Sequence, residues 1–404
     1  MNRKIYRLKG KVQHYQWGGS AFLPELLKLP NPEKKPFAEY WLGAHQNAPA
    51  VVEGLEPSLL NQYINQHPEV LGESVRKVFG RLPYLLKVLD VKDMLSIQVH
   101  PAKQAATIEY ENENRRGIPL NAPNRNYKDD NHKPELMVAL SDFWLLHGFR
   151  TNEEIIQLSK SIPEFAFMFP LLEEGGYKAL YKNIMEEDQD RVNRKLQPLL
   201  DRIVPAYQSG KLDKQDPNFW AARAALTFNE HELYDRGIFS VYLLNLVHLQ
   251  PGEAIFQDAG ILHAYLEGQN MEIMANSDNV LRGGLTPKHI DVGELMKHVT
   301  FRAHKPQVIK GTPVNENEQV FTSPAPDFEL SRVALEKSEV AEMTSITTEI
   351  FIVMRGTITI KDDSAAEIRL SKGEAAVCFD DAALTVTAGE SAELYRASVP
   401  TSLV

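Results

Sequence analysis

The sequence is poor in cysteine: Cys378 is the only one among its 404 residues, so no disulfide can form within the chain. This usage suits a reducing compartment, and we expect a cytoplasmic location. No uninterrupted apolar run approaches the roughly 20 residues of a membrane-spanning helix. The segment Met1–Leu8 also lacks the apolar stretch of a signal peptide. We therefore expect no membrane partner.

Positive charge is in deficit as well. Lysine and arginine number 44 against 54 aspartates and glutamates, and the net charge of -10 at pH 7 argues against a nucleic acid partner. An anionic ligand would have to be held by local cations, for which Lys133, Arg282 and Lys288 are candidates. The hydrophobic share of 43% and the charged share of 24% are typical of a globular protein, and the length predicts two or three domains.

The order of patterns along the chain predicts a mainly β protein with a helical insertion. Strand and turn signals fill residues 1–150 and resume in 236–304, and we expect these two parts to form one jelly-roll barrel that carries the site. Residues 151–235 have helical periodicity, with a capping signal at Thr151–Glu154, and would wall one side of the site. Spaced β-like runs in residues 305–404 fit a second jelly-roll barrel.

A short strand predicted at Leu95–Pro101 carries the first candidate metal ligands. Its apolar residues alternate with Ser96, Gln98 and His100, so these three side chains share one face. Pro101 has no N–H for a sheet ladder and should end the strand, which leaves His100 near a rim. The pattern is short, and the polar outer face of an ordinary amphipathic strand explains it equally simply.

Two later segments supply further candidates. Glu135 begins an apolar run, where an ionised carboxylate is costly unless it is paired or bound to a metal; an exposed glutamate at a strand start is the alternative. His263 follows a short strand and the turn Asp258–Gly260, whose glycine lets the next strand present an imidazole inward. Other histidines have no comparable partners in the sequence: His14, His67, His147, His231, His248, His298 and His304. We expect those to be surface or core residues.

The segment around His263 resembles the second metal-binding motif of the cupin barrels, and the resemblance extends further. The motifs that carry it are Tyr15–Gly18, Ala38–Gly43, Leu95–Pro101, Tyr127–Glu135, Gly260–Tyr265 and Asn276–Asp291. In this order they resemble the type I mannose-6-phosphate isomerases, also called phosphomannose isomerases. That family consists of zinc-dependent aldose–ketose isomerases that interconvert D-mannose 6-phosphate and D-fructose 6-phosphate.

The resemblance implies a site as well as a fold. It implies two cupin-type barrels and one Zn²⁺ per chain, held by the residues at the family's ligand positions: Gln98, His100, Glu135 and His263. It also implies that Arg282 is the catalytic arginine. Ala102 departs from the Asp or Asn that the family often has there, which removes no ligand. The last hundred residues match loosely, and we expect the second barrel to be metal-free.

Isomerisation requires removal of a carbon-bound proton and stabilisation of the resulting enediolate, which a metal with an open position can assist. The ligand types alone would also admit Mn, Fe or Ni. Arg282 suits the stabilisation of developing negative charge because its planar guanidinium stays charged. For the proton carrier the sequence leaves His132, Lys133, Glu272 and Asp278 open, with His132 and Lys133 preferred for proton transfer or phosphate contact.

We expect the substrate-binding residues to be Ser96, Lys133, Tyr265, Glu272, Asp278 and Lys288. The expected partner is a small sugar phosphate and the expected state a monomer, with oligomer formation left open. Two other functions remain open from the residues alone. One is another metallo-cupin enzyme acting on sugars, and the other is a non-catalytic sugar-binding cupin.

Overall fold

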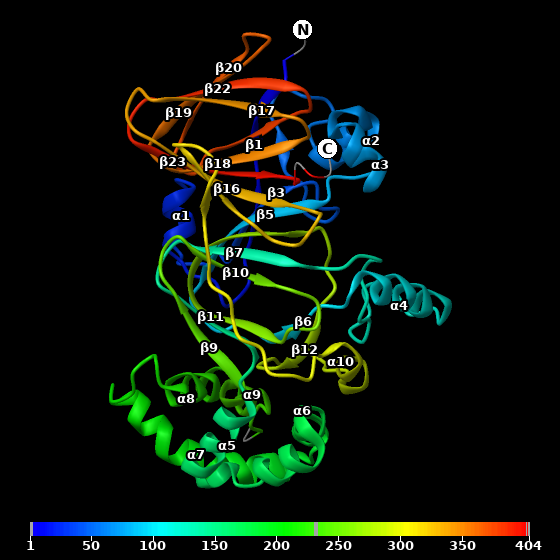
Figure 1. The fold of residues 1–404 in the computed structure, drawn as a ribbon, viewed down its shortest axis with the longest axis vertical. Helices are drawn as coiled ribbons and strands as arrows, with labels where there is room; N and C mark the ends of the chain where they lie inside the picture. Colours follow the sequence, from blue (N-terminus) through cyan, green and yellow to red (C-terminus); the bar gives the residue numbers. More distant parts are fainter. Residues whose placement is uncertain (1–2, 230–232, 401, 403–404) are drawn as a thin grey trace.

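The computed structural model describes residues 3–229, 233–400 and 402. Along its longest axis it places the strands of the C-terminal third at one end, a second group of strands in the middle and a group of helices at the other end (Figure 1). Within the described residues, no helix is long and apolar enough to cross a membrane.

The middle group of strands forms a barrel from two antiparallel sheets that share one long strand. One sheet has the order β13 (Ile309–Lys310), β10 (Glu253–Gln257), β7 (Glu135–Ala139), β11 (His263–Ala275), β5 (Tyr84–Val91), β3 (Glu39–Gly43) and β2 (Lys11–Gln13). The other joins β12 (Leu281–Gly284), β6 (Ile97–Val99), β11, β8 (Phe143–Phe149) and β9 (Leu244–Leu249). A register shift between Tyr265 and Glu267 marks where β11 passes from one sheet to the other.

Strand alternation explains why β6 is oriented as it is. Ile97 and Val99 are fully buried in the hydrophobic cluster that the barrel shares with the helices, so Gln98 faces the other way. The alternation predicted for this strand is therefore confirmed. β5 and β7 are buried along their whole length, as expected for central strands covered on both faces.

Helices fill the segment between β8 and β9. They are α5 (Asn152–Ser161), α6 (Met168–Glu186), α7 (Gln189–Gln208), α8 (Pro217–Phe228) and α9 (Gly237–Leu243). The predicted start at Thr151 is confirmed: Glu154 N–H donates to Thr151 Oγ1 at 3.3 Å, and Thr151 N–H donates to Glu154 Oε2 at 2.8 Å. This reciprocal capping box satisfies two amides at the helix end. The helices pack on the barrel through one apolar cluster.

The C-terminal strands form a second barrel. Its sheets have the orders β14 (Thr312–Pro313), β15 (Glu318–Phe321), β16 (Glu329–Leu335), β23 (Ala392–Ser398), β18 (Glu349–Arg355), β21 (Ala375–Cys378), β1 (Ile5–Lys9), β4 (Val51–Val52), and β17 (Val340–Ser345), β22 (Ala382–Ala388), β19 (Thr357–Asp362), β20 (Glu367–Ser371). The mainly β fold with two barrels and a helical insertion is confirmed. One feature differs from the simple order of segments, because β1 pairs with β21 from Ile5 to Leu8. The first strand of the chain thus completes a sheet of the last barrel.

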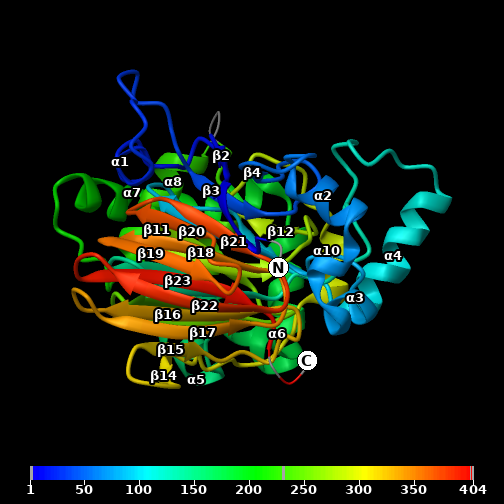
Figure 2. The same ribbon diagram turned by 90° about the horizontal axis from the view of Figure 1, so that it is seen from above.

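Shorter helices lie beside the two barrels. They are α1 (Phe22–Leu26), α2 (Leu60–Gln66), α3 (Glu73–Val78), α4 (Lys103–Arg115) and α10 (Val292–His298), with 3-10 turns at Pro68–Leu71 and Pro163–Phe165. Seen from above, α2, α3, α4 and α10 lie on one side of the strands (Figure 2). The ends of α4 and α10 meet through Tyr127, whose hydroxyl donates to Glu294 Oε1 at 2.6 Å.

Candidate active site

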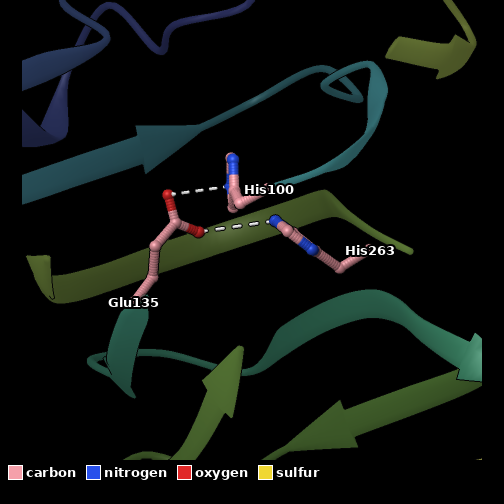
Figure 3. A group of neighbouring side chains, drawn as sticks. All are labelled: His100, Glu135 and His263. Carbon is pink, nitrogen blue, oxygen red and sulfur yellow. Dashed lines mark ion pairs between the residues drawn. The ribbon is translucent and has the colours of Figure 1, made fainter. Parts of the chain in front are cut away.

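Three predicted metal ligands from three strands or strand ends meet inside the middle barrel. His100 Nε2 lies 3.4 Å from Glu135 Oε1, and His263 Nε2 lies 3.4 Å from Glu135 Oε2 (Figure 3). The candidate ligand atoms all lie within 4.8 Å of one another, and each residue is at most 2% exposed. A metal ion could therefore bind all three side chains at once.

The two imidazoles are held so that one nitrogen of each is free. His100 Nδ1–H donates to Asn279 O at 2.9 Å, and His263 Nδ1–H donates to Ile261 O at 2.9 Å. Such contacts fix the tautomer that leaves Nε2 as a lone-pair donor. Neither Nε2 has a hydrogen-bond partner among the described residues, and 3.4 Å is long for a hydrogen bond. Burial lowers the pKa of His100 to about 4, which keeps this ring neutral near pH 7.

The structure also places Gln98 beside these ligands. In the sheet ladder Gln98 lies opposite His263 on one side and Arg282 on the other. Its side chain lines a cavity whose wall also includes Glu135. The donor set of two imidazole nitrogens, a carboxylate and an amide oxygen fits a borderline divalent cation such as Zn²⁺.

The cavity has a volume of about 810 Å³ and opens beside the ligand group. It gathers nearly all the residues predicted for the site: Ser96, Gln98, Lys133, Glu135, Tyr265, Glu272, Asp278, Arg282 and Lys288. His132 is not among the described residues that line it. Its Nε2 instead lies 2.9 Å from Asp327 Oδ2, a buried carboxylate of the β15–β16 connection. This contact directs the His132 ring away from the other candidates.

Two motifs that lie far apart in the sequence, Tyr127–Glu135 and Asn276–Asp291, form one hydrogen-bonded unit. Asp129 Oδ1 accepts from Ser277 Oγ at 2.8 Å, and Asp129 Oδ2 accepts from the Asp278 amide at 2.7 Å. Asn279 Oδ1 accepts from the Lys128 amide at 2.7 Å. Because Asn279 O also orients His100, this unit connects the metal ligands to the segment that carries Arg282.

A buried ionic network that the sequence analysis missed lies in the same cavity. Lys87 Nζ lies 3.0 Å from Glu272 Oε1 and 3.5 Å from Glu39 Oε2. Tyr265 donates its hydroxyl proton to Glu272 Oε2 at 2.8 Å. Burial alone would lower the pKa of Lys87, but the Glu272 and Glu39 carboxylates outweigh it and raise that pKa. The available signal was a single lysine within the otherwise apolar strand Tyr84–Val91.

Two cavity cations have no anionic partner. Within the described ranges 3–229 and 233–400, neither the Arg282 guanidinium nor the Lys288 ammonium makes an ion pair. Burial lowers the pKa of Arg282, and burial together with the nearby Arg282 charge lowers that of Lys288. By contrast, Lys133 Nζ lies 3.1 Å from Glu135 Oε1. Arg282 and Lys288 thus form a cationic part of the wall that lacks a counter-charge.

Histidines outside the metal group have mixed positions. His45 was not singled out from the sequence, yet it is buried and its Nε2 lies 3.2 Å from Asp278 Oδ1. His14 was expected to be an ordinary residue, but it lines the cavity. His147 is buried as a core residue, with both ring nitrogens lacking a hydrogen-bond partner among the described residues. His231 lies outside the described residues.

Comparisons with known proteins agree with this geometry. A family model described as phosphomannose isomerase type I, catalytic domain, matches residues 5–152. The mannose-6-phosphate isomerase of Escherichia coli (strain K12) is 36% identical over 405 residues, covering 97% of this chain and 100% of the relative. The enzyme of the same name from Rattus norvegicus is 34% identical over 441 residues, covering 100% and 98%.

Solved structures give the same result. The mannose 6-phosphate isomerase of Salmonella typhimurium, bound to substrate and a zinc atom, is 31% identical with a TM-score of 0.86, and the match covers 98% of this chain and 100% of that one. A mannose 6-phosphate isomerase bound with zinc and yttrium is 32% identical with a TM-score of 0.86 and the same coverage. With a full-length match above 30% identity and a His–Glu–His group in the cavity, the chain belongs to the type I mannose-6-phosphate isomerase family.

Proposed function

We propose that this protein is a zinc-dependent aldose–ketose isomerase that interconverts D-mannose 6-phosphate and D-fructose 6-phosphate. The observation that carries the proposal is one cavity that holds both a buried ligand group with two free imidazole nitrogens and two unpaired cations. The first feature suits a metal, and the second suits a phosphate. The Salmonella typhimurium relative that is bound to substrate and zinc supports both assignments.

We assign the metal to Gln98, His100, Glu135 and His263. When bound there, Zn²⁺ supplies Lewis-acid polarisation of the substrate oxygens. The residues provide the rest of the site: Asn279 O and Ile261 O fix the imidazole tautomers, and Lys133 partly offsets the charge of Glu135 at 3.1 Å. The first side chains to be tested as ligands are therefore the ones whose Nε2 atoms lack partners.

We assign the phosphate of the substrate to Arg282 and Lys288. A phosphate dianion favours guanidinium and ammonium donors that no other carboxylate occupies. Arg282 lies opposite Gln98 in the ladder, so it is close enough to the metal ligands to stabilise negative charge that develops on the sugar oxygens as well. Ser96, Tyr265 and Asp278 line the remaining wall and are proposed to contact sugar hydroxyls.

We assign proton transfer to Lys133. A side chain that removes the proton from C2 of the aldose and returns it to C1 must reach both carbons, so it has to lie in the cavity beside the metal ligands. Lys133 does so, whereas His132 contacts Asp327. Glu272 has both carboxylate oxygens engaged, by Lys87 and Tyr265, and Asp278 is engaged by His45. We therefore propose positioning roles for Glu272, Asp278 and His132.

A coupled assay of mannose 6-phosphate conversion, before chelation, after chelation and after zinc restoration, tests the proposed function. Activity that disappears with the metal and returns with it supports the isomerase. Oxygen consumption without aldose–ketose exchange would favour another metallo-cupin enzyme. Sugar phosphate binding without turnover in a zinc-replete sample would favour a binding protein. A monomeric state and a cytoplasmic location stay predictions.

Lys133→Gln tests the proton carrier. We expect kcat to fall by about 10²–10⁴-fold, the usual contribution of a positioned acid–base group, with a changed pH profile. Because Lys133 also contacts Glu135, zinc content must be measured in the same sample. Lys182→Gln, in an exposed helix pair with Glu186, is the matched control and should leave kcat unchanged. An unchanged pH profile at full zinc content would remove Lys133 from acid–base work.

A further inference from the structure

Asp235 is a buried carboxylate that joins the helical insertion to the cavity wall. It lies just before α9, and its Oδ1 accepts hydrogen bonds from the Gly237 amide at 2.7 Å and the Leu285 amide at 2.8 Å. Its Oδ2 accepts from the Thr286 amide at 3.0 Å. One side chain thus binds backbone amides on two segments about fifty residues apart in the sequence.

The segment that Asp235 holds has an unusual backbone. Leu285 has φ +53, a left-handed conformation that costs a residue with a Cβ about 1–2 kcal/mol. Gly284 has φ +129, and a Cβ built on it would clash with Gly237 Cα. The two glycines therefore allow the backbones of α9 and this segment to come into close contact. A conformation of this kind persists only when its surroundings hold it.

The same segment forms the cationic side of the cavity. Arg282 immediately precedes it, and Leu285, Thr286, Pro287 and Lys288 all line the cavity. Leu285 is fully buried, so its turn also fixes where the chain re-emerges toward Lys288. A shift of the Leu285 and Thr286 amides would therefore move the backbone on which both unpaired cations are carried.

We propose that Asp235 is a positioning residue of the helical insertion that sets the arrangement of Arg282 and Lys288 for the phosphate end of the substrate. This inference rests on the proposed function in so far as those cations bind the sugar phosphate. Asp235 does not line the cavity among the described residues, so it acts through the hydrogen-bonded segment. The insertion is thereby part of the substrate site as well as a cover for the barrel.

Asp235→Asn is the discriminating variant because it keeps the volume and removes one acceptor oxygen. The amide nitrogen would face a backbone N–H, so either the Leu285 or the Thr286 hydrogen bond is lost. In the zinc-loaded enzyme we expect KM for mannose 6-phosphate to rise at least tenfold, with a smaller fall in kcat and an unchanged zinc content. Hydrogen exchange of the Leu285 and Thr286 amides should accelerate at least tenfold.

Asp188→Ala is the matched control, because Asp188 also caps a helix of the insertion, at the start of α7, without touching the cavity segment. It should lower the thermal midpoint without changing KM. Asp235→Glu serves as a second variant if Asp235→Asn does not fold, since it keeps the charge but moves the carboxylate by one methylene; the same rise in KM is expected.

An unchanged KM in a folded, zinc-loaded Asp235 variant would overturn the inference, as would a KM change matched by the Asp188→Ala control. Hydrogen exchange separates this failure from a failure of the proposed function. If the wild-type protein does not isomerise mannose 6-phosphate but its Leu285 and Thr286 amides are protected and lose protection in Asp235→Asn, the anchoring role stands and only the substrate assignment fails. Unprotected amides in the wild type would refute the anchor directly.

Discussion

Replacing Lys87 with methionine tests the buried ionic network next to the metal ligands. Lys87 lies opposite Glu272 in the ladder of β5 and β11 and opposite Trp41 in that of β3. Lys87, Glu272 and Glu39 are 6%, 3% and 7% exposed, so water cannot replace the lost ammonium. The substitution leaves two carboxylates facing each other in a buried site.

The expected loss in the free energy of unfolding is about 3–5 kcal/mol, the range for removing one partner of a buried ion pair. Adding Glu272→Gln should recover about 2 kcal/mol of this loss, because the second variant removes one of the two stranded charges. The remaining carboxylate, Glu39, keeps the Trp41 indole N–H at 2.5 Å as a donor.

The pH dependence follows from the same charges. Burial raises the pKa of Glu272 even with Lys87 present, and removing Lys87 raises it further. A carboxyl group with a raised folded-state pKa binds more protons in the folded state, so the stability of Lys87→Met should fall as pH rises from about 5 to 8. The difference from the wild type should therefore be larger at pH 8 than at pH 5.5.

Urea unfolding of the zinc-loaded proteins at both pH values measures these effects. Lys182→Met is the control, because it removes an exposed lysine 3.8 Å from Glu186, a pair for which a change of about 0.5 kcal/mol or less is expected. If Lys87→Met cost no more than this control, or if Glu272→Gln failed to recover stability in the double variant, the description of the network as a buried ionic cluster would be wrong.

Two further predictions concern the backbone near His263 and the cluster at α10. Gly260→Ala should lower both stability and zinc affinity, because Gly260 has φ +82 and its new Cβ would lie 2.5 Å from Thr300 Oγ1; thermal unfolding and zinc titration check this, and wild-type affinity would contradict it. For Glu294, the His298 contact is the main cause that lowers the pKa to about 2, so Glu294→Gln should lower the thermal midpoint equally at pH 7 and pH 5. That difference should shrink only as pH falls from about 4.5 towards 2, and a difference that vanished at pH 5 would disprove the assigned pairing.

Local sequence was sufficient for the metal group because each ligand lies beside a strong backbone signal. Strand alternation placed Gln98 on one face of β6, the apolar run placed Glu135 at a buried strand start, and the glycine turn preceded His263. These signals act over a few residues. The choice of zinc among possible metals came from the family resemblance, since the ligand types alone admit several ions.

The remaining contacts depend on pairings that sequence patterns do not encode. Lys87 becomes part of the site only because β5 pairs with β11, which brings Glu272 opposite to it. His132 was favoured for its chemistry, but Asp327 from the distant β15–β16 connection determines where its ring lies. The first strand, Ile5–Lys9, could not be assigned to the last barrel without the register with β21. Long-range strand pairing was the missing information in all three cases.

The most direct test of the metal site is an anomalous-scattering map at the zinc edge from crystals of the zinc-loaded protein. We predict one peak per chain, within about 2.0–2.2 Å of His100 Nε2, His263 Nε2, a Glu135 carboxylate oxygen and the Gln98 amide oxygen. A peak at another location, or a cavity peak that leaves both imidazole nitrogens uncoordinated, would contradict the account.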